Sequence, residues 1–232
     1  MSKELLRLTT ELARHALQCR PGTSDLNVFH QVFVERAYAC LDEIRDVQLI
    51  LDCGANVGYS TAYLLSRFPA SHVIAIEPDP GNFALLRGNL APYGDSVKLL
   101  RSAVWSHPTG LVLSRAPYRD GMEWARQVRE CQPGEDPELL GVDISTILRQ
   151  FPDQRISILK MDIEGSEGVV FGSNYQPWIG LVDNIAIELH DDSVFGNCSA
   201  VFATAISGRG FSVARHGELT VCRKPREAVP CG

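Results

Sequence analysis

One acidic residue stands directly before a glycine turn that has the spacing of a ligand-binding loop. The segment LILDCGANVGYS, from Leu49 to Ser60, places Asp52 ahead of Gly54 and Gly58. Glycines there permit a tight turn and let a ligand approach the backbone. The spacing is not GxGxxG and no Lys-Ser/Thr pair follows, so neither a dinucleotide fingerprint nor a P-loop matches. Because Asp52 would repel a pyrophosphate, the residues favour a ligand with positive charge.

S-adenosylmethionine is such a ligand, since it carries an ammonium and a sulfonium group. Its ribose hydroxyls need an acid at the end of the next strand, and Glu77 stands there, about 20 residues beyond the glycines. Asp52 or its adjoining loop would then receive the methionine end. The competing interpretation is a plain strand–helix turn in which Asp52 caps the helix. A nicotinamide oxidoreductase is disfavoured by the same glycine spacing.

A second group of polar residues stands where two later apolar strands are expected to end, in the segments KMDIEGSE and IELHDD. Methyl transfer to an alcohol requires an aligned oxygen and a base that takes its proton. His190 is the expected general base, because imidazole titrates near neutral pH, and Glu188 or Asp162 would orient it. A rival hypothesis is a site for Mg²⁺ or Mn²⁺, with Asp191 as a further ligand. We favour the metal-free site and assign no metal ligand.

The elements that must position these residues alternate along the chain. Buried strands are expected at Val47 to Cys53, His72 to Glu77, Val97 to Trp105, Arg155 to Asp162 and Asn184 to His190. Helices are expected at Val57 to Phe68, from the segment PDPGN (Pro78 to Asn82) through Leu90, at Asp143 to Phe151, at Glu164 to Phe171 and within Val194 to Ser207. This order predicts an α/β fold with a mostly parallel sheet, helices on both faces and a reversed terminal hairpin. Ligands of such sheets bind beyond the carboxyl ends of the strands.

Three segments make up the expected domain organisation. Residues 1–45 are expected to form a helical extension, because Leu5, Leu8, Leu12 and Leu17 have helical spacing and a second helix begins near Val28. It would serve as a lid or pair subunits in a homodimer. Residues 46–223 form the ligand-binding domain, and residues 224–232 a flexible tail. Residues 115–141 show no clear periodicity and are interpreted as an insertion or active-site loop.

Composition limits the function classes. The net charge of −6 argues against general binding to nucleic acid or anionic membranes. No apolar run reaches the roughly 20 residues of a membrane span, and the acidic, amphipathic N-terminus is unlike a secretory signal. The seven cysteines form no CxxC pair, which favours reduced thiols. The expected location is therefore the cytoplasm, with no nucleic-acid or membrane partner.

Taken together in this order, the motifs DCGANVGYSTAYLLSRFP, IEPDPGNFALLRGNL, SAVWS, LKMDIEGSE and IELHDD resemble the FkbM-type S-adenosylmethionine-dependent methyltransferases. The resemblance spans roughly Thr23 to Arg223 and implies a class I methyltransferase, Rossmann-like fold of seven strands. It also implies O-methylation, commonly of hydroxyls on natural products or sugars. By position it places Ser102 and Ala103 near the adenine. The complete set of expected cofactor-binding residues is Asp52, Gly54, Ala55, Asn56, Gly58, Glu77, Pro78, Ser102, Ala103 and Asp162.

The sequence therefore predicts an O-methyltransferase that uses S-adenosylmethionine and a small-molecule hydroxyl acceptor. Its expected catalytic residues are His190, Asp162 and Glu188. The alternatives are a catalytically silent protein that binds S-adenosylmethionine and a methyltransferase assisted by a divalent metal.

Overall fold

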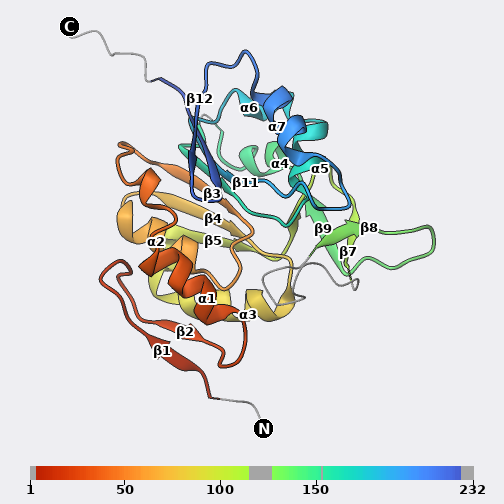
Figure 1. Ribbon diagram of the computed structural model, residues 1–232. Helices are drawn as coiled ribbons and strands as arrows, with labels where there is room; N and C mark the ends of the chain where they lie inside the picture. Colours follow the sequence, from red (N-terminus) through yellow and green to blue (C-terminus); the bar gives the residue numbers. More distant parts are fainter. Residues whose placement is uncertain (1–3, 115–126, 153, 226–232) are drawn as a thin grey trace, which may run out of the picture.

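A seven-stranded sheet forms the centre of the computed structural model, which describes residues 4–114, 127–152 and 154–225 (Figure 1). Its spatial order is β12-β13-β11-β10-β3-β4-β5. The strands are β3 Leu49–Cys53, β4 His72–Ile76, β5 Val97–Leu100, β10 Ile158–Met161, β11 Asn184–Glu188, β12 Ser212–His216 and β13 Leu219–Arg223. β13 is antiparallel to both of its neighbours, β11 and β12, while the pairs around β3 and β10 are parallel. The expected mostly parallel sheet with a reversed terminal hairpin is confirmed.

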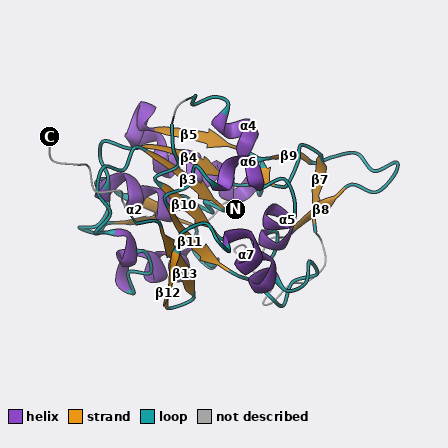
Figure 2. Cartoon of the chain, turned by 90° about the horizontal axis from the view of Figure 1, so that it is seen from above, coloured by secondary structure: helices purple, strands orange, loops and turns teal. Residues whose placement is uncertain are grey.

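Alternate residues of the central strands enter two separate hydrophobic cores, which explains why these strands are continuous apolar runs. Ile50 and Val73 face a core shared with α2 (Tyr59–Arg67) and α3 (Pro80–Leu90). Leu51 and Ile74 face the opposite core. That core contains α4 (Ile144–Leu148), α5 (Glu167–Gly172), α6 (Gln176–Ile179) and α7 (Cys198–Ile206), so helices cover both faces (Figure 2).

A turn delays the start of α5 relative to the expected helix at Glu164. Glu164 and Gly165 both have left-handed backbone conformations, with φ of +56° and +105°. Such conformations cannot be part of a right-handed helix, so the helix begins only at Glu167. The turn holds the Glu164 backbone at the carboxyl edge of the sheet.

A small second sheet corrects two expectations. Its order is β6-β9-β7-β8, built from β6 (Ala103–Val104), β7 (Gly110–Leu113), β8 (Val128–Glu130) and β9 (Leu139–Val142). The expected strand Val97 to Trp105 is therefore divided between two sheets, because Trp105 is buried in a separate core with Leu111 and Leu139. The segment 115–141 is not wholly a loop, since β8 and part of β9 lie in it; residues 115–126 lie outside the described residues.

The prediction of a first N-terminal helix is wrong. Residues 6–19 form an antiparallel hairpin of β1 (Leu6–Leu8) and β2 (Leu17–Cys19). Side-chain contacts with the main domain hold β2 extended: Asn89 accepts from the Gln18 backbone N–H at 2.6 Å, and the Tyr59 hydroxyl donates to the Gln18 carbonyl at 2.8 Å. The second helix is confirmed as α1 (Asp25–Phe29), which continues as a π-helix over His30–Val34.

The N-terminal segment is fastened to the domain close to the carboxyl ends of the strands. The Arg20 guanidinium forms an ion pair with Asp25 at 2.7 Å and donates to Asn82 of α3 at the same distance. Gln31 reaches Glu218, in the β12–β13 turn, at 3.4 Å. Pairing of subunits through this segment stays a prediction.

At the other end, the Lys224 backbone N–H donates to Asp183, so the start of the expected flexible tail is attached to the sheet. Residues 226–232 lie outside the described residues. Within the described part of the chain, every helix is too short or too polar to cross a bilayer.

Candidate active site

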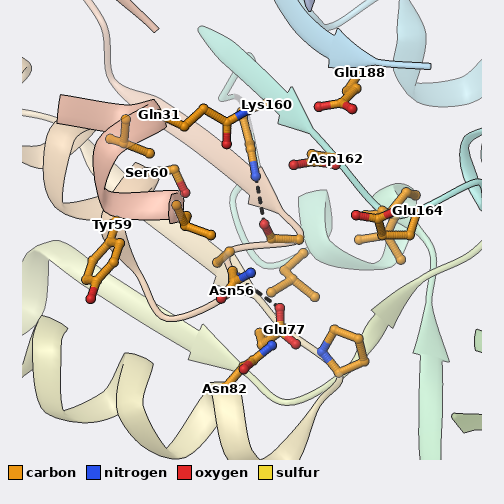
Figure 3. Close-up of a pocket in the computed structure, with 18 of the residues that line it drawn as sticks. Gln31, Asn56, Tyr59, Ser60, Glu77, Asn82, Lys160, Asp162, Glu164 and Glu188 are labelled. Atoms are coloured by element: carbon orange, nitrogen blue, oxygen red, sulfur yellow. Dashed lines mark hydrogen bonds between the residues drawn. The ribbon is translucent and has the colours of Figure 1, made fainter. Parts of the chain in front are cut away.

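A cavity of about 540 Å³ opens at the carboxyl ends of β3, β4, β10 and β11 (Figure 3). Its floor is the loop after β3, and the N-terminal segment contributes Gln31 and Glu35 to its wall. Such an edge is where open α/β sheets bind ligands, and the volume suits a cofactor-sized molecule. The position agrees with the sequence expectation.

Most of the expected cofactor residues line this cavity. They are Gly54, Ala55, Asn56, Glu77, Pro78, Ser102, Ala103 and Asp162. Gly54 is required by close packing, because a Cβ there would lie 1.8 Å from the carbonyl oxygen of Asp162 and its φ is +79°. Gly58 begins α2 with φ +90° and packs toward Leu90, so it shapes the turn without lining the cavity.

Glu77 at the end of β4 faces the cavity and organises the glycine loop. Its carboxylate accepts the backbone N–H of Asn56 at 2.9 Å and that of Asp79 at 2.8 Å. Burial raises the pKa of Glu77 to about 7, although both backbone donors act in the opposite direction. Glu77 is thus a nearly buried carboxyl that changes charge near neutral pH.

Asp52 does not line the cavity, which corrects its expected contact with a ligand. The carboxylate is fully buried and accepts the hydroxyls of Ser60 at 2.8 Å and Thr61 at 2.6 Å. Lys160 of β10 lies 3.1 Å from it and also donates to the Gly54 carbonyl at 2.7 Å. The interior therefore neutralises Asp52 with a lysine, and the pair joins β3 to β10.

An acidic cluster stands at the other end of the cavity, where β10 and β11 end. Asp162 and Glu188 line the cavity, as does Glu164 (Figure 3). The register pairs Met161 with Ile187, so the residues that follow them are neighbours at the sheet edge. Burial raises the pKa of Asp162 to about 6, against the effect of Lys160. The structure thus brings together the two acids that the sequence had placed there.

His190 lies behind the acidic cluster and outside the lining of the cavity, which argues against its expected role as general base. The ring is 1% exposed and does not line the cavity. Its Nδ1 lies 3.0 Å from Glu167 and its Nε2 lies 3.2 Å from Glu188. Burial alone would lower the pKa of His190, but the carboxylates of Glu167 and Glu188 outweigh it and raise the pKa to about 11. An imidazole already protonated at neutral pH cannot accept a proton from a substrate.

Asp191, the further ligand in the rival metal hypothesis, points away from the cluster. Its carboxylate accepts the backbone N–H and the hydroxyl of Ser199 at 2.8 and 2.7 Å, next to the start of α7. Glu167, at the start of α5, is fully buried against His190.

Sequence reasoning missed several lining residues. They include Gln31, Glu35, Tyr59, Ser60, Asn82, Lys160, Glu164 and Glu218. Lys160 carried a usable signal, because a lysine inside the apolar strand ILKM needs a buried counter-charge. The residues from the N-terminal segment and from the β12–β13 turn carried none, since only the tertiary fold places them beside the glycine loop.

The sequence is related to named methyltransferases. It is 25% identical over 206 residues to Methyltransferase 1 of Beauveria bassiana (strain ARSEF 2860), covering 81% of each chain. It is 24% identical over 216 residues to the 31-O-demethyl-FK506 methyltransferase FkbM of Streptomyces tacrolimicus, covering 80% of this chain and 81% of that protein. These relatives extend over most of both chains.

Among solved structures, a chain assigned as an rRNA methylase from Clostridium thermocellum superposes with a TM-score of 0.51 and 12% identity, over 84% of this chain and 97% of that chain. This likeness concerns the fold alone. The sequence model of the methyltransferase FkbM domain matches residues 52–213, which contain the glycine loop, Glu77 and the acidic cluster. The chain therefore belongs to the FkbM methyltransferase family.

Proposed function

We propose that this protein is an S-adenosylmethionine-dependent O-methyltransferase acting on a hydroxyl of a small-molecule acceptor. The supporting observation is that one cavity joins the glycine loop and Glu77 to the carboxylates of Asp162 and Glu188. The first pair of features suits the methionine and ribose of the cofactor. The carboxylates stand where the acceptor hydroxyl would be held and relieved of its proton.

The proposed step is an in-line displacement. The acceptor oxygen attacks the methyl carbon opposite the sulfur, so that a C–O bond forms while the C–S bond breaks. The electron pair of the broken bond stays on sulfur, and the sulfonium becomes a neutral thioether. The hydroxyl proton leaves toward the acidic cluster. Alignment of the two reactants supplies a large share of the rate enhancement.

The charge of the cavity favours a neutral, hydroxylated acceptor. Carboxylates of Glu35, Glu164, Glu188 and Glu218 surround it. Such a lining repels a phosphodiester backbone and accepts hydrogen bonds from hydroxyls. Sugars and hydroxylated natural products fit this description, and nucleic acid does not.

Calorimetry with S-adenosylhomocysteine tests the cofactor assignment. We expect one molecule to bind per chain, and Ser102→Trp to abolish binding because Ser102 lines the cavity. Ser207→Trp is the matched control, since Ser207 is exposed beyond α7. Failure of the wild-type chain to bind would overturn the assignment. Transfer of labelled methyl to a panel of hydroxylated acceptors separates an enzyme from a silent binding protein.

The pH dependence of binding provides a further prediction. Ionised Glu77 can accept the ribose hydroxyls, so affinity for S-adenosylhomocysteine should fall roughly tenfold between pH 8 and pH 6, as Glu77 gains a proton near pH 7. Glu77→Gln should bind weakly and lose most of the slope between pH 7 and pH 8, whereas Asp162, whose pKa is raised to about 6, still titrates at the acid end of the range. Glu35→Gln, which alters an exposed acid of the same cavity, should keep the wild-type slope. An unchanged slope in Glu77→Gln would contradict the prediction.

The raised pKa of Glu77 has the opposite effect on the stability of the ligand-free fold, because its contribution to the free energy of unfolding falls as the pH rises. Because the folded pKa of Glu77 lies above its ordinary value of 4.5, the folded state binds this proton more tightly than the unfolded chain does. The contribution of Glu77 to the free energy of unfolding is therefore complete below about pH 4.5 and is lost as pH rises through about 7. Urea unfolding of the wild type and of Glu77→Gln across this range measures it.

A further inference from the structure

The imidazole of His190 is surrounded by four carboxylates, an arrangement that the proposed methyl transfer does not by itself explain. Its Nε2 lies 3.2 Å from Glu188, 3.7 Å from Glu164 and 3.8 Å from Asp162. Glu167 faces the other ring nitrogen. A protonated imidazole brings a single positive charge to these four acidic side chains. A divalent cation would bring two.

The orientation of the ring is fixed from behind. Nδ1 of His190 lies 3.0 Å from Oε1 of Glu167, which also accepts the backbone N–H of Ile163 at 3.0 Å. Glu167 and the His190 side chain are both fully buried. A proton on Nδ1 that is donated to Glu167 leaves the lone pair of Nε2 directed at the cluster. Histidines that bind metals are held by carboxylates in this way.

Nε2 makes no hydrogen bond of acceptable geometry with any residue in the described part of the chain. It is therefore a buried polar atom aimed at three carboxylates, and its nearest contact, with Glu188 at 3.2 Å, is an ion-pair contact and not a well-formed hydrogen bond. Buried polar atoms of this kind are costly unless another partner is present. A metal ion in front of the ring would supply that partner, taking the place of the proton that the carboxylates otherwise hold there.

The spacing suits a small divalent ion. One atom each from Asp162, Glu188 and His190 lie within 4.8 Å of one another. Metal–ligand bonds of about 2.0–2.2 Å place two ligands of one ion roughly 3–4.4 Å apart, so shifts of a few tenths of an ångström would close the site. Glu164 can add a fourth ligand from the left-handed turn. Asp162, Glu164 and Glu188 also line the cavity, which leaves open coordination positions on its side.

We propose that Asp162, Glu188 and His190, supported by Glu164, bind a divalent cation of the Mn²⁺ or Fe²⁺ class. Carboxylates suit Mg²⁺ and Mn²⁺, while an imidazole ligand shifts the preference toward the transition metals. Its role rests on the proposed function: the cation would bind the acceptor hydroxyl and lower its pKa. Metal binding itself does not depend on that role. Glu167 is then a positioning residue that acts through His190.

Titration of the full chain with Mn²⁺ after chelator treatment tests the site. Free Mn²⁺ gives a sharp six-line electron paramagnetic resonance spectrum that broadens on binding, and pulsed measurements detect a coordinated imidazole nitrogen. We expect one Mn²⁺ per chain with nitrogen coupling. His190→Gln should lose that coupling, and Glu188→Gln should weaken binding at least roughly tenfold. Asp191→Asn is the matched control and should bind as the wild type does.

Glu167→Gln tests the positioning role and should weaken Mn²⁺ binding roughly 10–100-fold while nitrogen coupling persists at saturation. Absence of Mn²⁺ binding by the wild type, or equal binding by wild type and Glu188→Gln, overturns the metal site. Circular dichroism of each variant identifies a folding failure. If His190→Gln unfolds, Glu188→Gln still tests the metal site, because Glu188 lies at the cavity wall. Calorimetry with S-adenosylhomocysteine on the same sample reports independently on the proposed function.

Discussion

Lys160→Met should lower the free energy of unfolding by about 3–5 kcal/mol, because it leaves the Asp52 carboxylate buried without a counter-charge. Asp52 is 0% and Lys160 2% exposed, and 3.1 Å separates their charged atoms. The same substitution removes the donor to the Gly54 carbonyl. Urea unfolding measures the loss.

Asp52→Asn combined with Lys160→Met should recover more than half of that loss. Asparagine is neutral and keeps an oxygen for the hydroxyls of Ser60 and Thr61. Lys98→Met is the matched control at a half-buried position of β5, where the lysine reaches Gln150 near the surface and a change within about 0.5 kcal/mol is expected. A double variant as unstable as Lys160→Met would show that the uncompensated charge is not the cause.

Gly54→Ala should abolish binding of S-adenosylhomocysteine and destabilise the fold by several kcal/mol. The added Cβ would overlap a backbone carbonyl oxygen 1.8 Å away, at a residue with φ of +79°. The left-handed conformation alone costs an alanine about 1–2 kcal/mol, and the collision must further separate the ends of β3 and β10. Calorimetry and urea unfolding measure the two effects.

Gly208→Ala separates these two causes. Gly208 has a similar φ of +70°, but its Cβ would meet nothing within 4 Å. It should therefore show only the conformational cost and bind S-adenosylhomocysteine normally. If Gly54→Ala were no more harmful than Gly208→Ala, the close approach of the two strand ends would have no energetic importance.

Local sequence patterns predicted the strands that are buried on both of their faces. β3 and β10 are apolar apart from the paired Asp52 and Lys160, because each strand is buried on both faces, so a short run of residues already identifies them. The glycine loop and Glu77 follow such strands directly. Their position at the carboxyl edge therefore follows from the alternation of strands and helices.

Local patterns failed where a distant partner decides the conformation. The leucines of the N-terminal segment fit a helix, yet Leu6 and Leu8 pair with Cys19 and Leu17 in a hairpin. Asn89 and Tyr59 bind the β2 backbone, and neither contact is visible in the local sequence. Trp105 likewise leaves the expected strand because a second core accepts it.

The sequence by itself determined the family motifs, the parallel strands and the presence of Asp162, Glu188 and His190 at two strand ends. Only the tertiary structure decided what each side chain faces. It turned Asp52 inward to Lys160 and placed His190 behind the cavity wall, against Glu167. The reason is physical: residue order fixes which strand carries a side chain, whereas its charge state and function depend on the burial and counter-charges that neighbouring elements supply.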